Sequence, residues 1–347
     1  MNKYYFTSES VTEGHPDKIC DGISDYILDE ALRQDKNSKM AVEATIKDEL
    51  ILVYGEAKTR AKLDYEALAK SVLKKIGYEE EYQVIVKVGE QSSEINNAVE
   101  QDKIMAGDQG IMFGYACRDT DELMPLPIML ANKLAYQLTK VRKENENTFL
   151  KPDGKTQVTV EYIDDKPVRV DTIVIATQHK ESVSYNELKE YIIDYVIKPI
   201  IPKNLIDNNT KVLINTSGSF IIGGSFGDSG TTGRKIVVDT YGGMGKIGGG
   251  CFSSKDPSKV DRSGAYKARE IAKRIVKSSE EYYWCEVQLS YAIGREEPLA
   301  IYIKTNKGDL EVPKYLYEEC KPRNIIKDLE LKNECYEKRA MFGHFRD

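Results

Sequence analysis

The sequence has no excess of basic residues. Its 347 residues include 50 lysines and arginines against 56 aspartates and glutamates, so the formal net charge is −6. Proteins that bind nucleic acid without sequence preference need a strongly basic surface. The composition therefore argues against a nucleic-acid partner, and any phosphate that the protein binds is expected to be a small one.

Closely spaced cysteine pairs and long apolar runs are also missing. The six cysteines form no C-x-x-C pair, which argues against a zinc ribbon or a disulfide framework and favours reduced thiols in the cytosol. The first ten residues, MNKYYFTSES, contain no apolar run of signal-peptide length, and no later segment approaches the length of a membrane span. We therefore expect a cytoplasmic enzyme with no membrane partner.

The chain is too long for one ordinary core and predicts two or three domains in which strands and helices alternate. In the first part, apolar residues four apart predict a helix and alternating residues predict strands; the expected elements are a helix Pro16 to Arg33, strands Met40 to Ile46 and Leu50 to Tyr54, a helix Asp64 to Ile76 and a strand Gln83 to Val88. The polar stretch QSSEINNAVEQDK from Gln91 then predicts a connection between units.

Two further mixed units follow. The second is expected to contain a helix Ile128 to Lys143, a hairpin of strands Gln157 to Ile163 and Val168 to Thr177 that turns at Asp164-Asp165, and a helix Tyr185 to Ile197. The third is expected to contain a buried strand Lys235 to Asp239, a helix Ser258 to Lys277 and strands Glu286 to Ile293 and Leu299 to Thr305. No clean fixed-period repeat relates the units.

A glycine-rich run, GGSFGDSGTTGRKIVVDTYGG at residues 223–243, raises the question of what it holds. A Walker A loop is excluded because Lys235 is followed by isoleucine and not by serine or threonine. A dinucleotide fingerprint at Gly243, Gly245 and Gly248 is weakened because more glycines and Pro257 follow it where a helix should open. A turn cluster without a ligand also stays open.

The charges around this run suit a magnesium-polyphosphate site. Exposed backbone N–H groups can approach an anion closely, cations neutralise phosphate oxygens and carboxylates hold the metal. The cations are Arg234, Lys235, Lys255, Lys259 and Arg262, and the carboxylates are Asp228, Asp239, Asp256 and Asp261. Each of these could instead belong to a solvated charged surface.

A second candidate cluster, His15, Asp17 and Lys18, lies at the expected start of the first helix. Unsatisfied N–H groups and the helix dipole favour an anion there, and Asp17 could ligate a metal. Taken alone, His15 would more often be a structural or capping residue.

Four long motifs, in order, give the chain a resemblance to the S-adenosylmethionine synthetases, the methionine adenosyltransferases, from Phe6 to Phe345. They are GHPDKICDGISD (Gly14 to Asp25), GDQGIMFGYA (Gly107 to Ala116), GRKIVVDTYGG (Gly233 to Gly243) and KDPSKVDRS (Lys255 to Ser263). The resemblance implies that methionine sulfur attacks the 5′ carbon of ATP and that the released triphosphate is hydrolysed to pyrophosphate and phosphate. A thioether has no proton to lose, so such a site needs positioning and leaving-group stabilisation, not a general base.

The resemblance also implies an architecture: an α+β fold of three similar sheet-plus-helix domains around a pseudo-threefold axis. The expected domains are residues 1–92, 107–222 and 223–347, with a flexible active-site loop at 93–106. Family members form homodimers with active sites between the subunits, and whether dimers pair into tetramers stays open.

Residue by residue, the resemblance implies that His15, Lys155, Arg234, Lys235 and Lys255 contact the phosphates and are catalytic. Asp17 and Asp261 would hold the two Mg²⁺ ions and Glu43 the K⁺ ion. The remaining ATP contacts would be Asp153, Ser219, Phe220, Asp228 and Cys251, and the methionine contacts would be Glu56, Gln91, Asp228 and Lys259. Asp108 belongs to the GDQG motif near the site.

The sequence departs from the family pattern at several positions. Ser219 stands where arginine is usual, Ser225 where proline is usual, Thr231 where leucine is usual and Cys251 where alanine is usual. The connection from Gln91 to Met105 is a few residues short, and the common C-terminal tail is missing. These differences put the adenine contacts in doubt and leave open a relative with a shifted thioether or nucleotide preference, alongside a dinucleotide-dependent oxidoreductase and a non-catalytic regulatory subunit.

Overall fold

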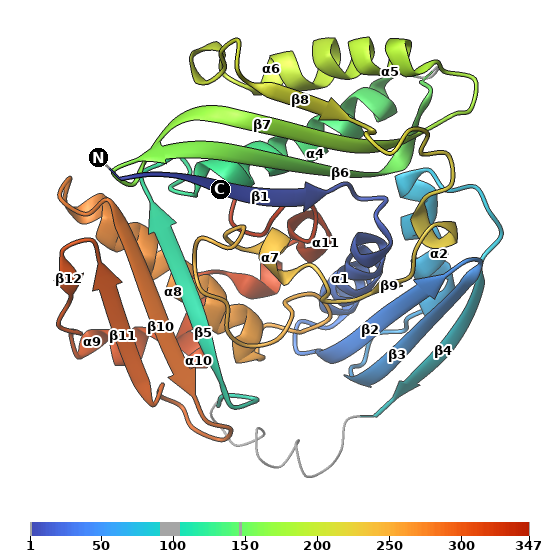
Figure 1. Ribbon diagram of the computed structural model, residues 1–347. Coiled ribbons are helices and arrows are strands. Elements are labelled where there is room, and N and C mark those ends of the chain that lie inside the picture. The colour runs from blue at the N-terminus through green and yellow to red at the C-terminus, as the bar shows by residue number, and fades with distance from the viewer. Residues whose placement is uncertain (1, 91–104, 146–147, 347) are drawn as a thin grey trace.

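The computed structural model of the chain describes residues 2–90, 105–145 and 148–346. Within them the chain forms three four-stranded sheets, each covered by helices, so the expected mixed α+β class is confirmed. The sheets lie around a central region that contains the helices α1, α7 and α11 (Figure 1). The division at residues 92/93, 106/107 and 222/223 stays a prediction, and the expected active-site loop from Gln91 falls almost wholly outside the described residues.

The first sheet, in the order β4-β3-β2-β9, is built mainly from the N-terminal part of the chain. Its strands are β2 (Lys39–Lys47), β3 (Leu50–Lys58), β4 (Gln83–Gly89) and the short β9 (Gly230–Thr231), and its helices are α1 (Pro16–Gln34) and α2 (Tyr65–Ile76). All five elements expected in this part are confirmed. Helix α2 begins after Asp64, whose side chain accepts from the N–H of Ala67, and ends at Gly77 with a φ of 107°.

The second sheet, in the order β1-β6-β7-β8, takes its first strand from the N-terminus of the chain. Its elements are β1 (Lys3–Val11), α4 (Leu126–Glu144), β6 (Leu150–Ile163), β7 (Lys166–His179), α5 (Tyr185–Ile192), the π-helical turn η1 (Ile193–Ile197), α6 (Lys198–Ile200), the 3₁₀ turn η2 (Lys203–Leu205) and β8 (Lys211–Ile214). The predicted hairpin is confirmed: Asp164 and Asp165 both have positive φ, as a tight two-residue turn requires.

The third sheet, in the order β12-β11-β10-β5, is antiparallel throughout and borrows β5 from the middle of the chain. Its elements are β5 (Gly110–Cys117), α8 (Val260–Ser278), β10 (Trp284–Tyr291), β11 (Ala300–Thr305), β12 (Gly308–Asp309), α9 (Tyr315–Glu319), α10 (Pro322–Asp328), η4 (Leu331–Asn333) and α11 (Tyr336–Arg339). The expected helix over Ser258 to Lys277 and the two expected strands are confirmed.

The expected buried strand Lys235 to Asp239 is wrong. After the short turn η3 (Gly224–Phe226), the strand β9 pairs with β2 for only two residues, and the chain then turns into the one-turn helix α7 (Ile236–Asp239). The hydroxyl of Thr240 donates to the carbonyl of Ile236 at 2.8 Å, which satisfies one end of that helical turn. A run of β-branched residues indicated a strand, but it is too short and too constrained by its neighbours to pair.

Helices α1 and α8 belong to one shared hydrophobic core between the first and third sheets. Ile23 and Ile27 of α1 and Ile271 of α8 are fully buried in it. The second sheet has a separate core against α4 and α5, centred on residues such as Val160 and Ile173. The loops at residues 224–235 and 249–259 contact the first turns of α1 and α8, where Gly230 lies against Pro16 and Gly249 lies against Asp261. The candidate site lies where these loops meet the two helices.

Candidate active site

Helix α1 begins at a capping histidine. The Nδ1 atom of His15 accepts from the N–H of Asp17 at 3.2 Å, so a neutral ring has its proton on Nε2. His15 is 3% exposed; burial and the charge of Lys235 lower its pKa to about 3 against the opposing effect of Asp17. The side chain is therefore a neutral hydrogen-bond donor at neutral pH, which a residue beside phosphates can use.

Asp17 draws the glycine-rich loop onto the start of α1. Its Oδ2 atom lies 2.6 Å from the Lys235 ammonium, and its Oδ1 atom accepts from the N–H of Thr231 at 3.0 Å and lies 3.5 Å from Nε of Arg234. Burial raises the pKa of Asp17, but Lys235 and the N–H of Thr231 outweigh burial and hold the pKa below its usual range. A side chain at Gly230 would place its Cβ 2.1 Å from the Pro16 carbonyl oxygen, so only glycine permits this approach.

The KPDGK segment at the start of β6 lies against the same helix start. The N–H of Thr12 donates to the carbonyl of Gly154 at 3.0 Å, and a Cβ on Gly14 would lie 2.5 Å from Pro152. The charges of Lys155 and Asp228 both affect the pKa of His15. The structure therefore gathers the predicted residues His15, Asp17, Lys155, Asp228, Arg234 and Lys235 in one place.

Asp153 lies in the same segment but is held by backbone. Its Oδ2 atom accepts from the N–H of Gly224 at 2.8 Å, and burial raises its pKa to about 6 despite that bond. Gln178 links it to the segment of Ser219 and Phe220, because its side chain accepts from the N–H of Asp153 and donates to the carbonyl of Ile221. The predicted ATP contacts Asp153, Ser219 and Phe220 thus lie close together.

A second group of predicted residues surrounds the start of α8. The Lys255 ammonium lies 2.5 Å from Oδ2 of Asp261, whose Oδ1 atom accepts from the N–H of Gly250 at 3.0 Å. Cys251 packs on Gly233, where a Cβ would lie 2.4 Å from that of Cys251. Burial raises the pKa of Cys251 to about 11, opposed by Lys255 and helped by the nearby Glu43.

The predicted methionine contacts are less well assembled. Lys259 pairs with Asp256 at 3.1 Å, and Asp256 also accepts from the N–H of Met40. Glu56 is exposed on β3, opposite Ala41. Within the described parts of the chain no hydrogen bond or ion pair joins Glu56, Asp228 and Lys259 to one another, and Gln91 lies outside those parts.

The sequence analysis missed that three carboxylates on α1 form a row along the helix and that each of them holds a loop. Asp17, Asp21 and Asp25 are four residues apart and so lie along one side of the helix. Asp21 accepts from the N–H of Gly233 at 2.8 Å, and Asp25 accepts from the N–H of Ser254 at 3.1 Å. Each carboxylate thus holds the backbone one to three residues before a cation that the sequence analysis predicts to contact phosphate.

Two buried cations neutralise Asp21 and Asp25, the second and third carboxylates of this row. Lys18 lies between Asp21 and Asp239, and the two carboxylates keep its pKa above the usual value although burial opposes them. Arg262, which the sequence analysis had assigned to the phosphate cluster, instead lies fully buried 2.5 Å from Asp25. Asp239 and Asp256, which it had grouped as metal carboxylates, are likewise committed to internal partners.

The donor set fits magnesium only with help from a substrate. Among residues 2–90, 105–145 and 148–346, no group of three or more histidine, cysteine, aspartate or glutamate side chains could hold a metal ion. Mg²⁺ is commonly held by one or two carboxylates together with water and substrate phosphates. Asp17 and Asp261 each present one carboxylate beside a lysine, which fits that mode. Glu43 accepts from the hydroxyl of Tyr54 at 3.3 Å and is the residue that could hold K⁺.

Comparisons with known proteins agree along the whole chain. Family models described as the N-terminal, central and C-terminal domains of S-adenosylmethionine synthetase match residues 3–102, 103–220 and 222–347. A Brachyspira hyodysenteriae protein named S-adenosylmethionine synthase is 47% identical over 370 aligned positions, which cover 99% of this chain and 94% of that protein. One of the same name from a Nitratiruptor species is 48% identical over 363 positions, covering 99% and 93%. No described helix is both long and apolar enough to cross a membrane.

Proposed function

We propose how this chain, which belongs to the S-adenosylmethionine synthetase family and is a methionine adenosyltransferase, makes S-adenosylmethionine. The sulfur of L-methionine attacks the ribose 5′ carbon of ATP and displaces the whole triphosphate. The bound triphosphate is then hydrolysed to phosphate and pyrophosphate.

One observation supports this proposal most directly: the cations gather on a buried carboxylate beside a neutral histidine. Arg234 and Lys235 meet at Asp17, and His15 presents an N–H group there. Sulfonium formation needs no general base, because the sulfur has no proton to lose. It needs a stabilised leaving group and in-line placement, which can contribute about 7–11 kcal/mol. A site with many phosphate donors, in which the histidine stays neutral, suits that reaction.

We assign the phosphate contacts to His15, Lys155, Arg234, Lys235 and Lys255. His15 donates from Nε2 to a triphosphate oxygen near the bond that breaks. Lysine ammonium groups that now lie on Asp17 and Asp261 turn to the phosphates when ATP binds, which frees the two carboxylates for Mg²⁺. Magnesium, when bound, neutralises the charge that develops on the leaving triphosphate. Glu43 holds K⁺ at the edge of the same region.

The two organic parts of the substrates have separate contacts. Asp153, Ser219, Phe220, Asp228 and Cys251 bind the adenosine side. Glu56 and Asp228 bind the methionine ammonium, Lys259 binds its carboxylate and Gln91 completes that side.

We further propose that two copies of the chain form a homodimer with the active sites between them. Apolar side chains are exposed on strands of all three sheets, for example Tyr5 (51%), Ile85 (46%) and Ile111 (46%). Exposed apolar patches of this kind are typical of surfaces that another protein covers. A second subunit would also supply partners for site residues, such as Lys155 and Glu56, that are exposed in one chain.

The reaction is tested by incubating the purified protein with ATP, methionine, magnesium and potassium. We expect S-adenosylmethionine, phosphate and pyrophosphate in equal amounts. Lys255→Ala should lower S-adenosylmethionine formation at least a hundredfold with an unchanged circular dichroism spectrum, whereas Lys74→Ala, a change at an exposed helical lysine far from the site in sequence, should not. Formation of the product by Lys255→Ala at the rate of Lys74→Ala would refute the assignment.

A shifted substrate preference is the alternative that the structure favours. Cys251 packs directly on Gly233, next to Arg234, and stands where the family usually has a smaller residue. A bulkier wall changes the room for the adenosine or the thioether. Comparing kcat/KM for methionine and ethionine in the wild type and in Cys251→Ala distinguishes the two: equal ratios in both proteins would exclude this alternative.

A further inference from the structure

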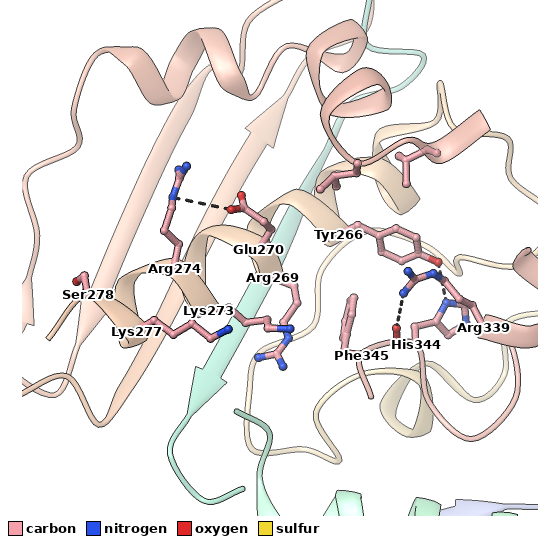
Figure 2. Close-up of a pocket in the computed structure, with 12 residues that line it drawn as sticks. Tyr266, Arg269, Glu270, Lys273, Arg274, Lys277, Ser278, Arg339, His344 and Phe345 are labelled. Carbon is pink, nitrogen blue, oxygen red and sulfur yellow. Dashed lines mark hydrogen bonds and ion pairs between the residues drawn. The ribbon is translucent and has the colours of Figure 1, made fainter. Parts of the chain in front are cut away.

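A cavity of about 670 Å³ lies away from the proposed active site, on the C-terminal half of α8. The segment at Leu329 and Leu331 and the C-terminal tail with His344 and Phe345 complete its wall (Figure 2). None of the predicted ATP, methionine or metal residues lines it. Its volume lies within the range of sites for small organic ligands.

The lining is basic although the chain as a whole is acidic. It contains five cationic side chains and one carboxylate, Glu270, against a net charge of −6 for the protein. Two of the five, Arg274 and Arg339, also pair with Glu319 and Glu334 outside the lining. Arg269, Lys273 and Lys277 are four residues apart and project from α8 toward the side on which Phe345 lies, whereas Arg274 points away from them (Figure 2). A concave surface of one sign concentrates ions of the opposite sign.

Arg269 carries a buried charge that internal structure does not neutralise. It is 4% exposed, and its Nη atoms donate only to backbone carbonyls, those of Tyr115, Leu123 and Glu122, at 2.7–2.9 Å. Its Nε atom is buried without a hydrogen-bond partner, and among the described residues no carboxylate pairs with its guanidinium. Carbonyl oxygens do not neutralise a buried charge, and such a charge is costly without a counterion.

Comparison with other arginines shows that this arrangement is unusual within the same region. Arg262, seven residues earlier on α8, is more deeply buried but pairs with Asp25. Arg274 pairs with Glu270 and Glu319. The helix dipole explains a lysine in the last turn, such as Lys277, but not an unpaired guanidinium in the middle of the helix. Arg269 therefore leaves a positive charge beside the cavity that no carboxylate of the described residues neutralises, and such a charge favours an anion in the cavity.

We propose that this cavity binds a phosphorylated organic molecule of nucleotide size. Its phosphates lie against the ammonium groups of Lys273 and Lys277, beside the unneutralised charge of Arg269. Its apolar part lies at the end of the cavity that Leu329, Leu331 and Phe345 line. The site is separate from the adenosyl transfer site and does not depend on the proposed reaction.

The test is calorimetric titration of the full-length protein with ADP as the probe. Lys255→Ala removes one of the proposed phosphate contacts and so weakens ADP binding at the active site. The part of the remaining binding that a substitution in the cavity removes then belongs to the cavity. Introducing Lys277→Glu into the Lys255→Ala variant should weaken that remaining binding at least tenfold. Lys74→Glu in the same background is the matched control, because Lys74 is also an exposed lysine in the last turn of a helix and both reversals disturb a helix dipole alike.

Two results would overturn the proposal: no ADP binding by Lys255→Ala at millimolar concentration, or equal binding by the Lys277→Glu and Lys74→Glu variants. Competition with inorganic phosphate identifies the ligand class. Displacement of ADP only at much higher phosphate concentration supports a ligand with an apolar part, and equal potency would overturn that part of the proposal. S-adenosylmethionine formation by Lys277→Glu in the otherwise unchanged protein should match the wild type, so failure here is distinguishable from failure of the proposed function.

Discussion

The Asp25 carboxylate makes a sharp prediction about how the site is built. Asp25 and Arg262 are both fully buried and lie 2.5 Å apart. Asp25 also accepts from the Ser253 hydroxyl at 3.0 Å and from the N–H of Ser254 at 3.1 Å. Ser254 has a φ of 82°, a conformation that a residue with a side chain adopts at a cost. Lys255 follows directly, so the carboxylate fixes the backbone that presents it.

Asp25→Asn should therefore cost both stability and activity. It keeps the shape and one acceptor oxygen but leaves the charge of Arg262 buried without a counterion, and breaking one side of a buried ion pair costs about 3–5 kcal/mol. Ser253→Ala is the matched control, because it removes one hydrogen bond to the same carboxylate and leaves the charge pair in place, and it should cost about 1.5–3 kcal/mol. We expect kcat to fall in Asp25→Asn as the loop before Lys255 loosens, with a smaller change in KM for methionine.

The stability difference is measured by urea unfolding followed by circular dichroism, with steady-state kinetics on the same samples at a temperature at which all variants are folded. A double variant, Asp25→Leu with Arg262→Met, removes both charges, and its loss of stability should be clearly smaller than the sum of the two single losses. Equal losses for Asp25→Asn and Ser253→Ala, or strict additivity in the double variant, would refute the reasoning that the buried charge pair anchors this loop.

Three further predictions follow from the same contacts. His15→Asn keeps a capping acceptor for α1 and should cost little stability, whereas His15→Ala should cost about 1 kcal/mol. Both variants should lose activity. An inflection due to His15 between pH 6 and 7 in the activity profile of the wild type would contradict the lowered pKa of His15. Asp153 has a pKa raised to about 6 from an ordinary value near 3.8, so between these two pH values its carboxyl group is protonated in the folded state and ionised in the unfolded state. The burial of this carboxyl group therefore destabilises the fold increasingly from about pH 4, and the effect is complete above pH 6. Asp153→Asn should hence stabilise the protein at pH 8 by up to about 3 kcal/mol and much less at pH 4, as urea midpoints at the two values will show. Gly230→Ala forces its Cβ against the Pro16 carbonyl and should reduce kcat strongly. Gly218→Ala is the control, because Gly218 has a positive φ but open space around its Cβ position, so this variant introduces backbone strain alone and should reduce kcat far less.

Local patterns predicted most helices and strands because those elements depend on their own residues. The apolar spacing of Ile19, Ile23 and Ile27 predicts α1, and the core buries these residues. The run from Ile236 failed as a strand prediction, because its fate depends on the loop that Asp17 and Asp21 hold and not on its own β-branched side chains. Likewise β1 and β5 join sheets of distant segments, and no local pattern specifies such a partner.

The candidate site was predictable as a set of residue types, and the family resemblance supplied most of the individual roles. What the sequence did not reveal is which charges are structural. Arg262 is a cation like the predicted phosphate ligands, and Asp239 is a carboxylate like the predicted metal ligands. In the structure, however, Arg262 neutralises Asp25 and Asp239 neutralises Lys18. Among the cations, burial distinguishes the two arginines: Arg262 is fully buried, whereas half of the Arg234 side chain is exposed.

The carboxylates of α1 are spaced four residues apart, and this spacing explains why a helix suits the task of positioning the loops of the site. A helix presents Asp17, Asp21 and Asp25 in one line at fixed separations, and each accepts a backbone N–H from a loop more than two hundred residues away in sequence. Backbone contacts place the loops without specifying the side chains that those loops present. The cations next to them can therefore exchange carboxylate partners for phosphates while the loop backbone stays in place, because the second and third carboxylates have cations of their own in Lys18 and Arg262. Of the three carboxylates, Asp17 has as its cationic partners Arg234 and Lys235, which are 51% and 17% exposed, and it is the one that we propose to bind metal.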